Sequence, residues 1–106
     1  MLPIFVFSLT PTLNSMPPDQ ADAYYLYILK SESADRYYIG ISSNPYRRLE
    51  YHNTLEKGFT SRYRPWKLVY ERQYPSKAEA QRAEKTVKRW KSRRMMENLI
   101  IGELTI

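Results

Sequence analysis

A chain of 106 residues is long enough for one small domain and too short for two full ones. With 42% hydrophobic and 26% charged residues it has the composition of a folded soluble protein, which excludes a wholly disordered chain. The absence of cysteine excludes disulfides, thiolate metal sites and cysteine nucleophiles, and suits the reducing cytoplasm that we expect as its location.

The N-terminal segment, residues 1–22, is predicted to be a disordered leader that precedes a domain over residues 23–106. It begins with an apolar run, MLPIFVFSL, that has no basic start and is far shorter than the ~20 residues of a membrane-spanning helix. Pro11, Pro17 and Pro18 follow, with little periodicity between them. We therefore expect neither a signal peptide nor a membrane anchor.

Positive charge is unevenly distributed along the chain. All 17 lysines and arginines lie from Lys30 onward, and the formal net charge is +6. This asymmetry favours a polyanionic partner, with a basic surface kept for solubility as the alternative. An amphipathic helix on a membrane surface is disfavoured because acidic residues are spread through the same part of the chain.

Three segments are predicted to be strands. AYYLYILK (residues 23–30) and YYIGIS (residues 37–42) are rich in β-forming residues and are separated by the polar stretch SESADR, which predicts a β-hairpin. WKLVYERQY (residues 66–74) predicts a third strand, and the stretch before it, residues 54–65, is predicted to be a long loop.

Three further segments are predicted to be helices. Asn44 followed by Pro45 indicates a helix start, and Asn53 is expected to end this helix in a left-handed conformation. The capping box Ser76-x-x-Glu79 predicts a helix over about residues 77–91, and Ser92 is expected to cap a last helix. The predicted order is β-β-α-β-α-α, an α+β domain.

The hairpin places two tyrosines on one face. Because strand side chains alternate, Tyr27 on the first strand and Tyr38 and Gly40 on the second are expected to share a face. The opposite, core face is expected to carry Leu26, Ile28, Ile39 and Ile41. Gly40 has no side chain, so a phosphate could approach closely beside the two rings. The alternative for either tyrosine is ordinary aromatic packing on a half-buried sheet.

Arg48 and His52 lie four residues apart on the first predicted helix and so project from one ridge. Arginine binds phosphate with its planar fork, and histidine exchanges protons near neutral pH. The two can therefore converge on one anion. The alternative is a solvated arginine next to a surface histidine.

Glu84 lies on a flank of the apolar stripe of the second predicted helix, where an unpaired carboxylate would be costly. A divalent cation is one possible partner, because Mg²⁺ commonly takes one or two protein carboxylates together with water and phosphate oxygens. A salt bridge to Lys85 or Lys88 is the equally weighted alternative.

A basic face is predicted on the same helix. Between Arg82 and Arg94 there are seven basic residues against the single acid Glu84. Such a face would bind phosphates without regard to sequence and would lose affinity steeply with salt. The residues we assign to it, with three from the preceding loop, are Arg82, Lys85, Lys88, Arg89, Lys57, Arg62 and Arg64.

Taken together, these residues resemble the GIY-YIG nuclease superfamily, and within it the small single-domain UPF0213-type predicted endonucleases. The resemblance covers about Tyr24 to Ile101 and rests on YLY, YIG, RLEYHN, PWKLVY and AQRAEK in this order. It implies a three-stranded antiparallel sheet flanked by helices, with one divalent metal ion, Mg²⁺ or Mn²⁺, held by Glu84. It also implies a DNA endonuclease, DNA being favoured over RNA, with roles in DNA repair among the functions of such enzymes.

By this resemblance Tyr27, Tyr38, Arg48, His52 and Glu84 form the catalytic site. A water would attack the phosphate in line while a tyrosine assists its deprotonation and Arg48 holds the phosphate. Either tyrosine could be the base, with His52 as the group that receives its proton. The alternative function is a nucleic-acid-binding module that keeps the fold without turnover, and the oligomeric state is left open.

Overall fold

The computed structural model describes residues 23–106 as one α+β domain, so the leader predicted over residues 1–22 lies outside the described residues. Every predicted strand and helix is present in the predicted order. No helix within residues 23–106 has the length and apolar character to span a bilayer. The elements are β1 (Tyr24–Ser31), β2 (Tyr37–Ser42), α1 (Pro45–Thr54), the short 3₁₀ helix η4 (Phe59–Tyr63), β3 (Trp66–Tyr74), α2 (Lys77–Trp90) and α3 (Arg93–Ile100).

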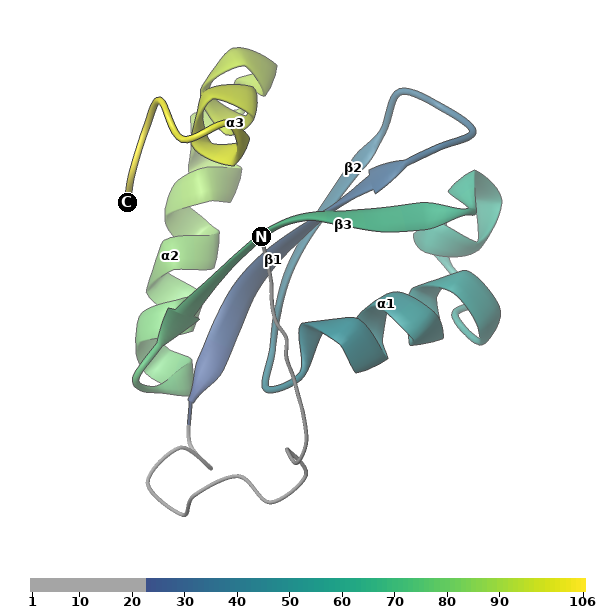
Figure 1. The fold of residues 1–106 in the computed structure, drawn as a ribbon, viewed down its shortest axis with the longest axis horizontal. Coiled ribbons are helices and arrows are strands. Elements are labelled where there is room, and N and C mark those ends of the chain that lie inside the picture. The colour runs from purple at the N-terminus through teal and green to yellow at the C-terminus, as the bar shows by residue number, and fades with distance from the viewer. Residues whose placement is uncertain (1–22) are drawn as a thin grey trace.

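The three strands form one antiparallel sheet with the order β2-β1-β3, which confirms the predicted fold class. Tyr27 pairs with Gly40 and Leu29 pairs with Tyr38 in the hairpin, so Tyr27 and Tyr38 are diagonal neighbours on one face. Figure 1 shows α2 and α3 on one side of the sheet and α1 with η4 on the other. β2 is an edge strand, so ligands can reach it from the side.

The sheet is buried on both faces, whereas the sequence analysis predicted a core on one face. Leu26 and Ile28 pack with Ala83 and Val87 of α2 and Leu99 of α3. On the other face Tyr27 and Leu29 pack with Trp66, and Tyr38 and Leu49 lie against this second cluster. The central strand β1 therefore has apolar or aromatic residues at consecutive positions, as expected for a strand covered on both sides.

The end of α1 differs from the prediction. Asn53 does not end the helix in a left-handed conformation, because the helix continues to Thr54 and is capped by Leu55 in a right-handed conformation. The side chain of Asn53 instead accepts a hydrogen bond from the Trp66 backbone N–H (2.7 Å) and donates one to the Trp66 carbonyl (3.0 Å). Asn53 thus joins α1 to the start of β3, and the predicted loop that follows contains η4.

The caps of the last two helices are confirmed. Ser76 accepts a hydrogen bond from the Glu79 backbone N–H, and Ser92 accepts one from that of Met95. Lys91, between the two helices, has φ of 50°, the left-handed conformation that commonly ends a helix. These caps satisfy backbone donors that would otherwise lack partners and so fix where α2 and α3 begin.

Candidate active site

Tyr27 lies over Gly40 on the sheet face that packs against α1. Its side chain is buried, with 1% of the residue exposed. A Cβ atom at position 40 would come within 2.8 Å of the Tyr27 hydroxyl and 3.1 Å of the Tyr38 ring. Only glycine at position 40 therefore leaves space for both tyrosine rings, which lie 6.2 Å apart between centroids.

Helix α1 brings Arg48 and His52 to the same place. His52 Nε2 lies 3.1 Å from the Tyr27 hydroxyl, within hydrogen-bond distance, and the His52 ring lies 4.5 Å from the Tyr38 ring between centroids. Arg48, one turn earlier, stacks on the Tyr51 ring at 4.5 Å. Within residues 23–106 Arg48 forms no ion pair with an acid, so its charge is not neutralised by a carboxylate.

The segment after α1 holds His52 from the other side. His52 Nδ1 lies 3.1 Å from Thr60 Oγ1, and Thr60 is itself buried with 1% exposed. The Trp66 indole N–H donates to the Thr60 carbonyl at 2.8 Å, and Arg64 Nε donates to the His52 carbonyl at 2.7 Å. The imidazole is thus hydrogen-bonded at both ring nitrogens, which fixes its orientation.

His52 and Tyr27 are both neutral near pH 7, and burial shifts both pKa values further from it. Removal from water, together with the positive charge of Arg48, lowers the pKa of His52 to about 4. Removal from water also raises the pKa of the Tyr27 phenol to about 12, although Arg48 beside it acts in the opposite direction. A neutral imidazole donates at one ring nitrogen and accepts at the other, so it can carry one proton along the line from Tyr27 to Thr60.

Glu84 stands apart from these four residues, on α2 across the sheet. Its carboxylate pairs with Lys88 Nζ at 3.0 Å, one of the two partners considered from the sequence, and its side chain is 21% exposed. No hydrogen bond or ion pair within residues 23–106 joins it to Tyr27, Tyr38, Arg48 or His52, but its charge is among the causes that raise the pKa of Tyr27.

The residues present fit a hydrated divalent ion better than a metal enclosed by protein ligands. No group of three His, Cys, Asp or Glu side chains in the described part of the chain could enclose a metal. A single partly exposed carboxylate, such as that of Glu84, is a usual anchor for Mg²⁺, which keeps several of its waters. An ion at Glu84 would compete with Lys88 for the carboxylate.

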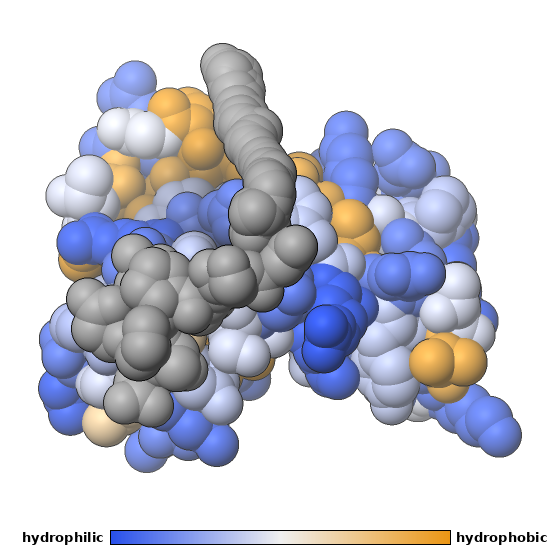
Figure 2. All heavy atoms as spheres, turned by 60° about the horizontal axis from the view of Figure 1, so that its bottom comes forward, coloured by the Kyte–Doolittle hydropathy of each residue, from blue (hydrophilic) through white to orange (hydrophobic). Residues whose placement is uncertain are grey.

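The basic residues assigned to nucleic acid do not form one continuous face. Figure 2 shows mainly hydrophilic side chains on the face that it turns forward, outside the grey atoms. On α2, Lys88 lies toward β2 while Arg82 lies toward Tyr74 of β3, and Lys85 and Arg89 are exposed.

The three basic residues from the segment before β3 differ in their surroundings. Lys57 and Arg62 are exposed. Arg64 is half-buried, and its guanidinium donates to the carbonyls of His52 and Glu56. Arg64 therefore holds the end of α1 in place, a role that the sequence does not reveal.

Thr60 was not among the residues singled out from the sequence. It lies eight residues after His52 in a segment that reads as loop, and a threonine there has no distinguishing pattern. Its contact with Nδ1 depends on η4, which folds the segment back over α1. The aromatic Trp66, which holds the Thr60 carbonyl, is the nearest sequence signal, since a buried indole N–H needs an acceptor.

The chain is similar to known proteins of one family. The sequence profile of the GIY-YIG catalytic domain matches residues 23–98. The chain is 43% identical over 61 residues to a structure-specific endonuclease subunit SLX1 homolog of Giardia intestinalis, a match that covers 55% of this chain and 17% of that protein. It is 40% identical over 68 residues to a UPF0213 protein of Streptococcus pneumoniae, covering 63% of this chain and 68% of that protein. A UPF0213 protein of Bacillus halodurans, solved by NMR, is 35% identical with a TM-score of 0.48, covering 74% of this chain and 82% of that one.

Proposed function

The chain belongs to the GIY-YIG family, and from this premise we propose that it is a divalent-metal-dependent endonuclease that hydrolyses phosphodiester bonds in nucleic acid, DNA in preference to RNA. One observation carries the proposal: Tyr27, Tyr38, Arg48 and His52, which come from three separate elements, converge in one cluster. A module that only binds nucleic acid has no need for a buried, hydrogen-bonded pair of tyrosine and histidine beside an arginine that forms no ion pair within the described residues. The family match and the endonuclease name of the Giardia intestinalis relative support the same interpretation.

Arg48 is proposed to hold the scissile phosphate. A guanidinium that stacks on Tyr51 is oriented in advance, and its fork matches two phosphate oxygens. The same anion would lie near His52 and offset the charge of Arg48, which is one of the causes that lower the pKa of His52. Substrate binding therefore makes His52 a better proton acceptor than it is in the free protein.

Tyr27 is proposed to assist the attacking water. Its hydroxyl donates its proton to His52 Nε2 while its oxygen accepts a proton from the water, so no free phenolate has to form at a pKa of about 12. This direction requires that His52 Nδ1–H donates to Thr60 Oγ1. Tyr38 is the second candidate, because it is less buried than Tyr27 and its ring contacts the same imidazole.

Glu84 is proposed to hold one Mg²⁺ or Mn²⁺, which when bound supplies charge stabilisation for the leaving oxygen. Glu84 is supported in this role by its partly exposed carboxylate and by its electrostatic effect on Tyr27. Lys88, which neutralises Glu84 in the free protein, would be released toward the phosphates.

The test is a cleavage assay on plasmid, branched and single-stranded substrates with Mg²⁺ or Mn²⁺. Arg48→Gln should lose cleavage by about 100-fold or more, because a charge-assisted contact to the phosphate is lost. Arg47→Gln is the matched control, since Arg47 is the exposed neighbour on the same helix. Absence of cleavage of every substrate by the parent, or equal rates for the two variants, would overturn the proposal.

A further inference from the structure

A cavity lies on the other side of the edge strand from the proposed catalytic cluster. This cavity of about 370 Å³ is formed by the hairpin turn, β2, α2 and α3. Its lining carries four cationic side chains, from Arg36, Lys88, Lys91 and Arg93, against the single acid Asp35. A cavity with this excess of positive charge attracts an anion.

The inner lining of the cavity is apolar. Ile39 of β2, Val87 of α2 and Met96 of α3 contribute to it. Lysines and arginines on a convex surface can contact the phosphates of a duplex from outside, and such contacts do not require an apolar surface, here the apolar floor of the cavity. Apolar surface below a cationic rim suits a ligand with a flat apolar part and an attached anion, as a nucleotide has.

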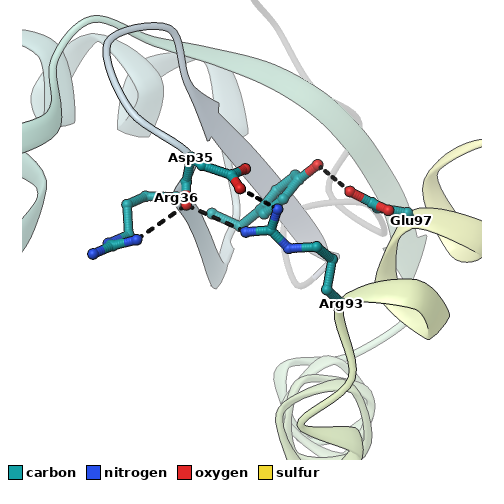
Figure 3. A network of polar contacts seen from close by, with 5 residues as sticks. Asp35, Arg36, Arg93 and Glu97 are labelled. Carbon is teal, nitrogen blue, oxygen red and sulfur yellow. Dashed lines mark hydrogen bonds and ion pairs between the residues drawn. The ribbon is translucent and has the colours of Figure 1, made fainter.

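Figure 3 shows that the arginines of the rim are held in place by the hairpin turn. Arg93 donates to the carboxylate and to the backbone carbonyl of Asp35, and Arg36 donates to the same carbonyl at 3.2 Å. Arg93 also lies over the Tyr37 ring at 5.6 Å, and the Tyr37 hydroxyl donates to Glu97 at 3.2 Å. The Arg93 guanidinium is therefore oriented before any ligand arrives, whereas the Arg36 guanidinium lies over the Tyr63 ring, 5.4 Å from its centroid.

The cavity is connected to the catalytic cluster through the edge strand. Ile39 lies on the face of β2 opposite to Tyr38 and Gly40, and within residues 23–106 no further strand pairs with β2 on its outer side. Lys88 belongs to the rim and pairs with Glu84, so the rim begins next to the proposed metal ligand. A strand held at the catalytic cluster can pass over this edge into the cavity.

We propose that the cavity binds an unpaired nucleotide of the substrate strand, with its phosphate on Lys91 and Arg93 and its base on the apolar floor. A paired base could not enter, because its edges and faces are covered within the duplex. The inference rests on the proposed nuclease function and narrows its substrate to nucleic acid that carries a single-stranded segment beside the cleaved bond.

Removal of the Asp35 charge is predicted to strengthen DNA binding, the opposite of the effect expected when a cationic residue of the cavity is removed. Its carboxylate is exposed, and its hydrogen bond with Arg93 holds its pKa below the usual range, so it is charged at neutral pH. A phosphate that enters the rim is repelled by this charge and must share Arg93 with it. Asp35→Asn should therefore tighten binding of DNA with an overhang.

The experiment measures binding by fluorescence anisotropy, with EDTA present so that no cleavage is needed. The probes are a blunt DNA duplex, the same duplex with a single-stranded overhang, and the overhang duplex with abasic positions in place of the unpaired bases. The overhang should bind roughly fivefold or more tightly than either of the other two. Because no turnover is involved, an inactive enzyme does not affect this outcome.

The variants are Arg93→Gln and Lys91→Asn, with Lys67→Gln as the matched control on exposed surface outside the cavity. Asparagine suits position 91 because it tolerates the left-handed backbone there. Each cavity variant should weaken overhang binding and lower the salt slope of the affinity by about 0.7. Equal affinity for blunt, abasic and normal overhang DNA, or a loss in Lys67→Gln as large as in the cavity variants, would overturn the proposal.

Discussion

The Tyr27 hydroxyl and His52 Nε2, which are 25 residues apart in the chain, lie 3.1 Å from each other in the buried centre of the site. Neither group is well suited to proton transfer on its own. A phenol with a pKa of about 12 is a poor proton donor, and an imidazole with a pKa of about 4 is a poor proton acceptor at neutral pH. As a pair, however, they can move a proton without either one being charged at rest.

The first prediction separates the two tyrosines. Tyr27→Phe removes the hydroxyl that contacts His52 and should reduce kcat by about 100-fold or more, while Tyr38→Phe retains this contact and should reduce it less. Single-turnover cleavage rates of the two variants measure the difference. If Tyr38→Phe is the slower enzyme, the proton leaves through Tyr38, and if both cleave at the parent rate, neither tyrosine takes part.

The second prediction concerns Thr60 as a positioning residue for His52. Thr60→Val keeps the shape of the side chain but removes the acceptor for Nδ1–H, so the tautomer with a proton on Nε2 becomes favoured. We expect kcat to fall by about tenfold or more with KM unchanged, and a shifted pH profile.

Thr60→Ser is the control, because it restores the oxygen and should restore the activity. Loss of a hydrogen-bond partner for a buried group also costs about 1–3 kcal/mol in the free energy of unfolding. Both variants are therefore compared at a temperature at which both are folded. A Thr60→Val enzyme that is destabilised yet has the parent pH profile would reduce Thr60 to a structural role.

Much of the fold could be predicted because its signals are local. Ser76 and Ser92 cap helices through atoms three residues away, and the hairpin follows from alternation and a polar turn. Asn53 was interpreted by the same local logic, as a helix stop, and this was wrong. Its amide binds the Trp66 backbone, a partner that only the tertiary fold supplies.

In the candidate site too, local features could be predicted from the sequence and tertiary contacts could not. Arg48 and His52 share a ridge because of helix periodicity, and Tyr27 and Tyr38 share a sheet face because of strand alternation. Only the family resemblance implied that the helix ridge and the sheet face meet. Thr60 could not be found from the sequence, because its bond to His52 depends on the path of η4.

The third prediction concerns Gly40, which has no side chain. Gly40→Ala would place a Cβ atom 2.8 Å from the Tyr27 hydroxyl, so the Tyr27 ring must shift away from its contact with His52. Overpacking of this kind costs about 1–3 kcal/mol in the free energy of unfolding. Cleavage should fall by more than the folded fraction does, as measured by activity and circular dichroism on the same sample. Parent activity in a folded Gly40→Ala protein would contradict the proposed use of Tyr27.

The fourth prediction separates the two possible roles of Glu84. Glu84→Gln removes both the carboxylate and the pair with Lys88, whereas Lys88→Gln removes the pair alone. We expect Glu84→Gln to lose metal-dependent cleavage and Lys88→Gln to retain most of it. The stability of both should change by less than about 1 kcal/mol, because a partly exposed ion pair contributes little.

Isothermal titration with Mn²⁺ gives a readout that does not depend on turnover. The parent and Lys88→Gln should bind the ion, Lys88→Gln the more tightly, because the competing ammonium group is gone. Indistinguishable Mn²⁺ binding by the parent and Glu84→Gln would remove Glu84 as the metal ligand.

The last prediction follows from the neutral, buried His52. Its pKa is about 4 in the folded protein and near its ordinary value of 6.5 in the unfolded chain. Above pH 6.5 the imidazole is neutral in both states, and between pH 6.5 and 4 only the unfolded chain gains a proton there. The free energy of unfolding should therefore fall as the pH falls, by about 2 kcal/mol between pH 7 and pH 5.

Urea denaturation of the parent and of His52→Gln at these two pH values measures this contribution. Glutamine can occupy the buried position without titrating, so the difference between the two proteins isolates His52 from all other groups. The parent should lose more stability than the variant on acidification, and parallel losses would mean that His52 is protonated as readily in the folded protein as in the unfolded chain. In that case the imidazole would carry a proton near pH 6, and it could accept one from Tyr27 only at higher pH, where it is neutral.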